Sequence, residues 1–138
     1  MKIFVDTNIL VDLIADRQPF SKYAVELFTR AETDLVTLYT SSHSIATTHY
    51  LLKKYIHEKE LREVLIHLLD YITVISVDLS IIKKSLKSNY KDFEDALQIY
   101  SAHSVEGIEC IVTRNLKDFK GAHIPVYSPD EVVAILIV

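Results

Sequence analysis

Carboxylate side chains occur in three separated segments of the sequence, in places that suit a divalent-metal site. Asp6 directly follows the apolar run Lys2–Val5. Asp92 and Asp95 open a predicted helix, and Asp118 follows a later apolar run. Mg²⁺ and Mn²⁺ take oxygen ligands, commonly a few carboxylates with water and substrate phosphate. Such a cation relieves the repulsion between the acids and activates water, so the site would hydrolyse a phosphodiester.

Each acid also has a simpler interpretation, and from the residues alone both interpretations stay open. Asp6 would serve equally as a helix N-cap, and Asp92 would suit the positive end of a helix dipole. Asp118 would serve equally as an ordinary loop acid. Asp95 differs because it lies at helical spacing from the apolar Ile99. That spacing puts it close to the apolar helix face, where an unpaired acid is costly.

Several other kinds of site are excluded by residue types that the chain lacks. It contains two glycines, so neither a P-loop nor a glycine-rich dinucleotide loop is possible. It has no Gly-x-Ser-x-Gly segment for a serine nucleophile. Its single cysteine, Cys110, excludes a cysteine-based zinc cluster and is expected to be a buried thiol. The six histidines show no regular metal-ligand spacing.

Short β-rich runs alternate with amphipathic helical patterns along all 138 residues. This alternation predicts one α/β domain, residues 1–138, with a parallel sheet covered by helices on both faces. The apolar segment 134–138 is expected to pack into the core or against a second subunit. The predicted strands are 2–5, 35–40, 71–77, 109–113 and 125–127; the predicted helices are 9–15, one from Pro19, one from 41–44 to about Ile56, 58–69, one from Asp78, 92–105 and one from Ser128.

Ligands of open parallel sheets bind beyond the carboxyl ends of the strands. The polar residues that follow the predicted strands are therefore the candidates for a site. Three separate segments supply acids or amides that would meet at this edge of the sheet. The candidates beside the acids are Thr7, Asn8, Thr113, Arg114 and Asn115.

The charge and the hydropathy pattern bear on location and partners. The formal charge of −4 is unusual for a nucleic-acid binder, although acids gathered around a bound cation would be partly neutralised. An acid arrives at position 6, before a signal-peptide apolar region could form, and no uncharged apolar run reaches membrane-spanning length. We expect a cytoplasmic protein without membrane contact.

Three blocks of the sequence, taken in order, resemble the PIN-domain family. They are KIFVDTNIL (2–10), DFEDALQ (92–98) and VTRNLKDF (112–119), and the ending IPVYSP (124–129) followed by Glu131 is also similar. The resemblance runs over nearly the whole chain. It implies a Rossmann-like three-layer α/β/α sandwich with a central, mainly parallel sheet, and a Mg²⁺- or Mn²⁺-dependent ribonuclease activity.

The resemblance also implies partners and site positions. Small members of the family are often VapC-type toxins that form homodimers and are silenced by a cognate antitoxin protein. By motif match, Asp6 takes the first acidic position and Asp95 the third. Asn115 falls where many members have aspartate, and Asp118 is the nearby acid that would share that role. Asp6 and Asp95 would hold the metal, with Asp92 or Asp118 assisting through water.

The second acidic position departs from the family pattern. The family commonly has a glutamate in the helix after the second strand, whereas the segment 42–50 contains no acid. Thr48 is taken to occupy that place, and a hydroxyl is a weaker, neutral ligand. The consequence would be a lower metal affinity, compensation by Asp92, or loss of activity.

The leading hypothesis is a metal-dependent endoribonuclease in which Asn8 and Asn115 orient ligands and Thr7 and Thr113 hold the loop geometry. Arg114, together with Lys117 and Lys120, would steer RNA. Two alternatives stay open: a weakened PIN domain that binds RNA or protein without cutting, and a phosphatase on a similar sheet. The phosphatase is less favoured because enzymes with an aspartate nucleophile usually have a second acid two residues later, and here that position is Asn8.

Overall fold

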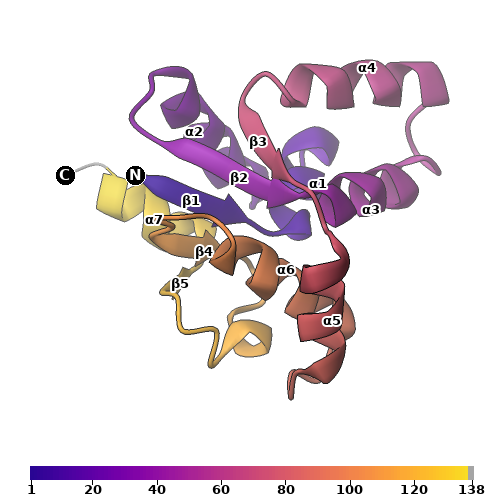
Figure 1. Cartoon of the computed structure of the whole chain (residues 1–138). Helices are drawn as coiled ribbons and strands as arrows, with labels where there is room; N and C mark the ends of the chain where they lie inside the picture. Colours follow the sequence, from indigo (N-terminus) through magenta and orange to yellow (C-terminus); the bar gives the residue numbers. More distant parts are fainter. Residues whose placement is uncertain (137–138) are drawn as a thin grey trace.

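A five-stranded parallel sheet organises the protein, as a computed structural model that describes residues 1–136 shows. The strand order is β3-β2-β1-β4-β5, and each neighbouring pair is parallel. The predicted alternation of strands and helices is confirmed (Figure 1). The elements are β1 (Lys2–Val5), α1 (Thr7–Ala15), α2 (Ser21–Glu32), β2 (Thr37–Ser41), α3 (Ser42–Leu52), α4 (Glu58–Leu68), β3 (Ile72–Ile75), α5 (Leu79–Lys87), α6 (Phe93–His103), β4 (Cys110–Val112), the 3-10 helix η1 (Leu116–Phe119), β5 (Val126–Tyr127) and α7 (Pro129–Leu136).

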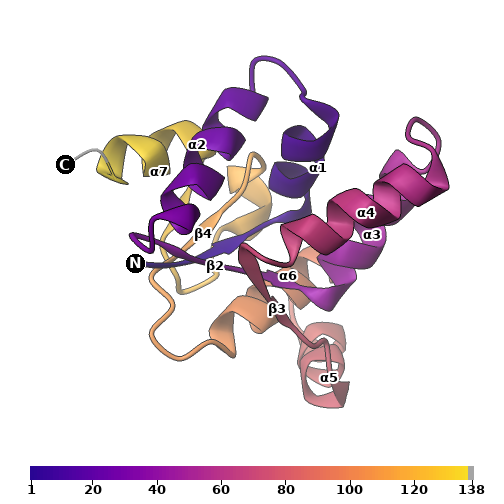
Figure 2. The same cartoon turned by 90° about the horizontal axis from the view of Figure 1, so that it is seen from above.

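The two faces of the sheet are buried under different helices, which gives the predicted α/β/α sandwich. Side chains alternate between the faces of a strand, so Ile3 and Val5 of β1 point into one cluster and Phe4 into the other. Figure 2 shows α1, α2 and α7 on one side of the strands and α5 and α6 on the other. Because both faces are covered, the central strands β1 and β4 are mainly apolar, as buried parallel strands usually are.

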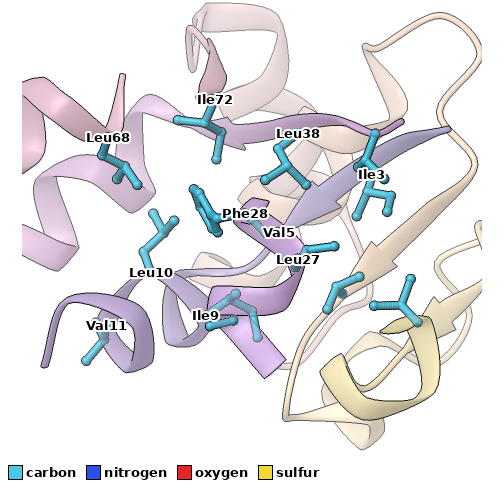
Figure 3. Close-up of a cluster of buried hydrophobic side chains, with 14 of the residues drawn as sticks. Ile3, Val5, Ile9, Leu10, Val11, Leu27, Phe28, Leu38, Leu68 and Ile72 are labelled. Atoms are coloured by element: carbon cyan, nitrogen blue, oxygen red, sulfur yellow. The ribbon is translucent and has the colours of Figure 1, made fainter. Parts of the chain in front are cut away.

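The larger core cluster lies between the sheet and the helices α1, α2, α4 and α7. Phe28 stands among the aliphatic side chains of these elements, close to Leu10 and Leu68 (Figure 3). The second cluster packs Ile99 and Ala102 of α6, together with Phe119 of η1, against Phe4 and Ile111. Cys110 is buried in the larger cluster, which confirms its structural role.

The observed element boundaries differ from the predicted ones in a few places. The helix that was expected to reach Ile56 ends at Leu52, because the chain turns there and α4 packs back against α3. The 3-10 helix η1 was not predicted. Val132 and Val133 of α7 enter the core, while Ile137 and Val138 of the apolar terminal segment lie outside the described residues.

The carboxyl edge of the sheet collects the ends of several elements. Strands β1, β2 and β4 are neighbours and end there, and α1 and α3 each begin within two residues of a strand end. Helix α6 leads into β4 and returns across the sheet, so its first turn lies at the same edge. Three helix N-termini, which carry partial positive charge, therefore converge where the predicted site residues are. Within residues 1–136, no helix is long and apolar enough to cross a membrane.

Candidate active site

A pocket of about 230 Å³ opens at the carboxyl edge of the sheet. Its walls come from the ends of β1 and β4 and from helices α1, α3 and α6, so segments far apart in sequence meet in it. Asp6 and Asp95, the two predicted metal ligands, both line it. The other lining residues are Thr7, Asn8, Val11, Arg17, His43, Thr47, Leu51, Glu94, Gln98 and Asn115.

The Asp6 carboxylate is held by hydrogen bonds to both of its oxygens. Oδ1 accepts from the backbone N–H of Thr7 at 2.8 Å and from Gln98 Nε2 at 3.0 Å. Oδ2 accepts from Thr113 Oγ1 at 2.8 Å and, at a longer 3.4 Å, from Asn8 Nδ2. Asp6 is 6% exposed and is also the N-cap of α1. Asp6 therefore caps helix α1 and lines the pocket at the same time, so its role as an N-cap does not exclude a role in the site.

Asp95 lies half-buried in the first turn of α6 and has the most perturbed carboxyl of the pocket. Its pKa is raised from 3.8 to about 7. Burial is the largest cause, and the negative charges of Asp92, Asp6, Asp118 and Glu94 add to it in that order. The acids of the three predicted segments are thus near enough to repel one another, which is the electrostatic situation that a bound cation relieves.

The polar residues beside the acids form a connected network. Asn8 Nδ2 donates to Thr113 Oγ1 at 3.3 Å, and Asn8 Oδ1 accepts from the Arg114 backbone N–H at 3.3 Å. Thr113 Oγ1 in turn accepts from the Asn115 backbone N–H at 3.0 Å. Thr7 Oγ1 donates to a serine hydroxyl of α3 at 2.9 Å. These bonds join the loops after β1 and β4, as predicted from their positions.

Arg114 makes an ion pair that was not predicted from the sequence. Its Nε and Nη2 donate to the two carboxylate oxygens of Asp12 at 2.6 and 3.1 Å, and its guanidinium stacks on the ring of Phe20 at 4.2 Å. Asp12 is 1% exposed, so this bidentate pair neutralises a buried charge on α1. The guanidinium of Arg114 is occupied by this structural contact and does not line the pocket.

Three further predicted residues lie beside the pocket rather than in its wall. Asp92 is exposed and accepts from the Asp95 backbone N–H at 3.0 Å as the N-cap of α6. Asp118 is exposed on η1 and acts on Asp95 only through its charge. Thr48 is fully buried and its hydroxyl donates to the Ser44 carbonyl of its own helix. Thr48 does not line the pocket, and the residues of α3 that do are His43, Thr47 and Leu51.

Several pocket residues had no signal in the sequence. Gln98 is buried and donates a hydrogen bond to Asp6. A single polar residue within an apolar helix pattern does not by itself predict a functional site. His43 lies 3.1 Å from Glu94, pairing α3 with α6 across the pocket. Arg17, from the loop between α1 and α2, gives the lining of the pocket a positively charged side chain. These residues are identified as part of the site only because the fold places them in the pocket wall.

The donor set of the pocket fits a hard cation held by few protein ligands. Asp6 and Asp95 supply carboxylate oxygens and Asn115 an amide, and Mg²⁺ commonly binds through one or two carboxylates while keeping several waters. Across residues 1–136, no group of three or more His, Cys, Asp or Glu side chains has the arrangement of a metal site. The pocket therefore suits a cation that is bound partly through water and substrate phosphate, and it does not suit a structural zinc ion.

The fold and the pocket together define a class: a parallel α/β/α sandwich with an acidic site at the carboxyl edge of its sheet. Residues 2–117 match the family model described as PIN domain. The chain belongs to the PIN domain family.

The similar proteins agree with this assignment. Ribonuclease VapC1 of Aquifex aeolicus is 30% identical over 135 residues, which are 94% of this chain and 92% of the relative. The toxin-antitoxin complex from Klebsiella pneumoniae contains a chain of 28% identity, with a TM-score of 0.67 over 92% of this chain and 97% of that one. VapBC2 from Rickettsia felis, bound to a DNA fragment from its promoter, has a similar fold at 20% identity, a TM-score of 0.66, and coverage of 93% and 98%.

Proposed function

We propose that this protein is a VapC-type ribonuclease, the toxin of a toxin–antitoxin pair, and that it requires Mg²⁺ or Mn²⁺. The observation that carries the proposal is the meeting of Asp6 and Asp95, 89 positions apart in the sequence, in one pocket where their charges repel. The similarity to a ribonuclease named VapC1 supports the choice of RNA as substrate.

In the proposed mechanism, Asp6 and Asp95 would hold the cation, and the amide of Asn115 in the same pocket wall would be available to it. The cation, when bound, supplies charge neutralisation and Lewis-acid polarisation of the scissile phosphate. The hydrogen bonds from Thr7 and Thr113 contribute to holding the Asp6 carboxylate in the pocket wall. Asp95, with its pKa near 7, holds or releases a proton at its carboxyl at neutral pH when no cation is present.

RNA would be positioned by the cationic side chains around the pocket. Arg17 lies in the pocket wall, and the exposed Lys117 and Lys120 lie on and after η1. The converging N-termini of α1, α3 and α6 add partial positive charge, which favours a phosphate group. These positive groups are local, whereas the net charge of −4 describes the whole chain.

The remaining parts of the proposal concern assembly and location. We propose that the chain is one PIN domain over residues 1–138, acts in the cytoplasm, and forms a homodimer. We also propose that a cognate antitoxin protein silences it. The similar chains from Klebsiella pneumoniae and Rickettsia felis come from a toxin-antitoxin complex and a VapBC pair, which supports an antitoxin partner.

The test compares the wild-type protein with Asp6→Asn and Asp95→Asn on a structured RNA in the presence of Mg²⁺, with and without EDTA. We expect the wild type to cleave only with the metal, and both variants to be inactive while their circular dichroism shows a folded protein. Cleavage at the wild-type rate by both variants would refute the assignment. A further arm with p-nitrophenyl phosphate separates a ribonuclease from a phosphatase, since only the latter hydrolyses the small ester efficiently.

A second function, RNA or protein binding without cleavage, is favoured by one observation. The α3 wall of the pocket presents Thr47 and His43 and carries no acid, so the site has fewer carboxylates than the family pattern. Under this alternative the wild-type protein would bind RNA but leave it intact at saturating Mn²⁺. The same cleavage assay, combined with a gel-shift measurement, decides between the two functions.

A further inference from the structure

A buried glutamine reaches from α6 to the end of β1. Gln98 is 2% exposed and belongs to the second turn of α6, on the side that faces the strand ends. Its amide lies among polar groups of two other segments, residues 6–7 and 41–44, although most of its helix neighbours are apolar. A buried amide needs partners for its donors and for its acceptor, so its surroundings define what it holds in place.

The two ends of the Gln98 amide have different partners. Nε2 donates to Asp6 Oδ1 at 3.0 Å and to Ser44 Oγ at 2.5 Å. Oε1 accepts from Ser41 Oγ at 2.5 Å. The hydroxyl of Ser41 therefore fixes which way the amide is turned, and the amide in turn presents its NH₂ group to Asp6.

The two serines also hydrogen-bond to each other. Ser41 Oγ also lies 3.2 Å from Ser44 Oγ, and it accepts from the Ser44 backbone N–H as the N-cap of α3. An apolar side chain at position 98 would leave these bonds in place. Ser41, Ser44 and Asp6 would each lose one hydrogen bond, and Asp6 Oδ1 would keep only the backbone N–H of Thr7.

The two oxygens of the Asp6 carboxylate differ in the lengths of the hydrogen bonds that they accept. Oδ1 has contacts of 2.8 and 3.0 Å, from Thr7 and Gln98, whereas Oδ2 has one of 2.8 Å, from Thr113, and one of 3.4 Å, from Asn8. A carboxylate has about four lone-pair sites, and all are in use. The Asn8 contact is the longest, so Oδ2 is the oxygen that gives up a hydrogen bond most easily.

We propose that Gln98 is a positioning residue that locks Asp6 Oδ1 and thereby leaves Oδ2 as the oxygen for the metal ion. The inference rests on the proposed function, because it assumes that Asp6 is a metal ligand. Residues that orient a ligand through hydrogen bonds commonly change metal affinity by about 10–100-fold when they are replaced.

The test uses Gln98→Met, which keeps the length of the side chain and removes the amide. The matched control is Ser101→Ala in the same helix, where a buried hydroxyl bonds only to the Leu97 carbonyl, at 2.6 Å. We expect the affinity for Mn²⁺, measured by calorimetry, to fall about 10–100-fold in Gln98→Met and to stay at the wild-type value in Ser101→Ala. A purely structural role would lower the melting temperature of both variants and leave both affinities equal.

If Gln98→Met folds poorly, the variant Ser41→Ala and a crystal structure can still test the proposal. Ser41→Ala releases the amide of Gln98 without removing it, so it should weaken Mn²⁺ binding less than Gln98→Met does. A crystal structure of either variant should show the Asp6 carboxylate rotated from its wild-type orientation. An unrotated Asp6, or an affinity equal to that of Ser101→Ala, would overturn the role of Gln98. Failure of the wild-type protein to bind Mn²⁺ would instead contradict the proposed function, and the orientation of Asp6 would still decide what Gln98 does.

Discussion

Replacing the Asp95 carboxylate by the amide of asparagine should stabilise the metal-free protein at neutral pH. The pKa of Asp95 is raised to about 7, mainly by burial and then by the neighbouring acids. Between its ordinary pKa of 3.8 and this value, the folded state binds more protons than the unfolded state. The free energy of unfolding therefore falls as the pH rises through this window, and above about pH 7 the loss is complete. Asparagine has no proton to lose and removes this dependence.

The size of the effect follows from the pKa and from the exposure of the side chain. A rise from 3.8 to about 7 would correspond to roughly 4 kcal/mol for a carboxyl shielded from water. Asp95 is only half-buried, so solvent screening reduces the effect to about 1–2 kcal/mol. The gain of Asp95→Asn should appear at pH 8 and vanish at pH 4, where the wild-type carboxyl is protonated in the folded state.

Urea unfolding in EDTA, measured at several pH values from 4 to 8, checks this prediction. The control is Asp70→Asn, which neutralises an exposed acid just after α4 and should leave the stability unchanged. Saturating Mg²⁺ should stabilise the wild type more than Asp95→Asn, because the variant lacks the charge that the cation neutralises. The reasoning would be refuted if Asp95→Asn were no more stable than the wild type at pH 8.

Further predictions concern the contacts around the pocket. Arg114→Met leaves the Asp12 carboxylate buried without its partner, so urea denaturation should show a loss of about 3 kcal/mol, and an unchanged stability would contradict the structural role. Thr47→Glu adds a carboxylate to the pocket wall and should tighten Mn²⁺ binding about tenfold in a calorimetric titration, whereas weaker binding would argue against a metal site there. Arg17→Gln should weaken RNA binding equally across sequences and reduce its salt slope by about 1, and an unaltered slope would place RNA elsewhere.

The fold was predictable because apolar runs and helical patterns alternate along the whole chain. Lys2–Val5 and Cys110–Val112 are buried on both faces, so their continuous apolar character identifies them as parallel strands. The end of α3 was less predictable, since the apolar spacing continues to Ile56 although the helix stops at Leu52. There the packing of α4 against α3, a tertiary contact, overrides the local pattern.

The acids of the pocket were predictable from their positions after strands and at a helix start. The pairing of Arg114 with Asp12 was not predicted because Asp12 lies about a hundred positions away on α1. Thr47 was missed because a shift of one residue along a helix moves a side chain by 100° around its axis, and the sequence has no acid to fix the register. Gln98 was missed because its partners come from two segments that are distant in the sequence, at Asp6 and at Ser41–Ser44.

The central claim is that Asp6 and Asp95 hold one divalent cation between them, and anomalous diffraction from a crystal soaked in Mn²⁺ tests it most directly. We predict a single strong peak at the manganese edge within bonding distance of both carboxylates, in the pocket at the carboxyl edge of the sheet. A map without a peak there, or with manganese bound only elsewhere on the chain, would contradict the account.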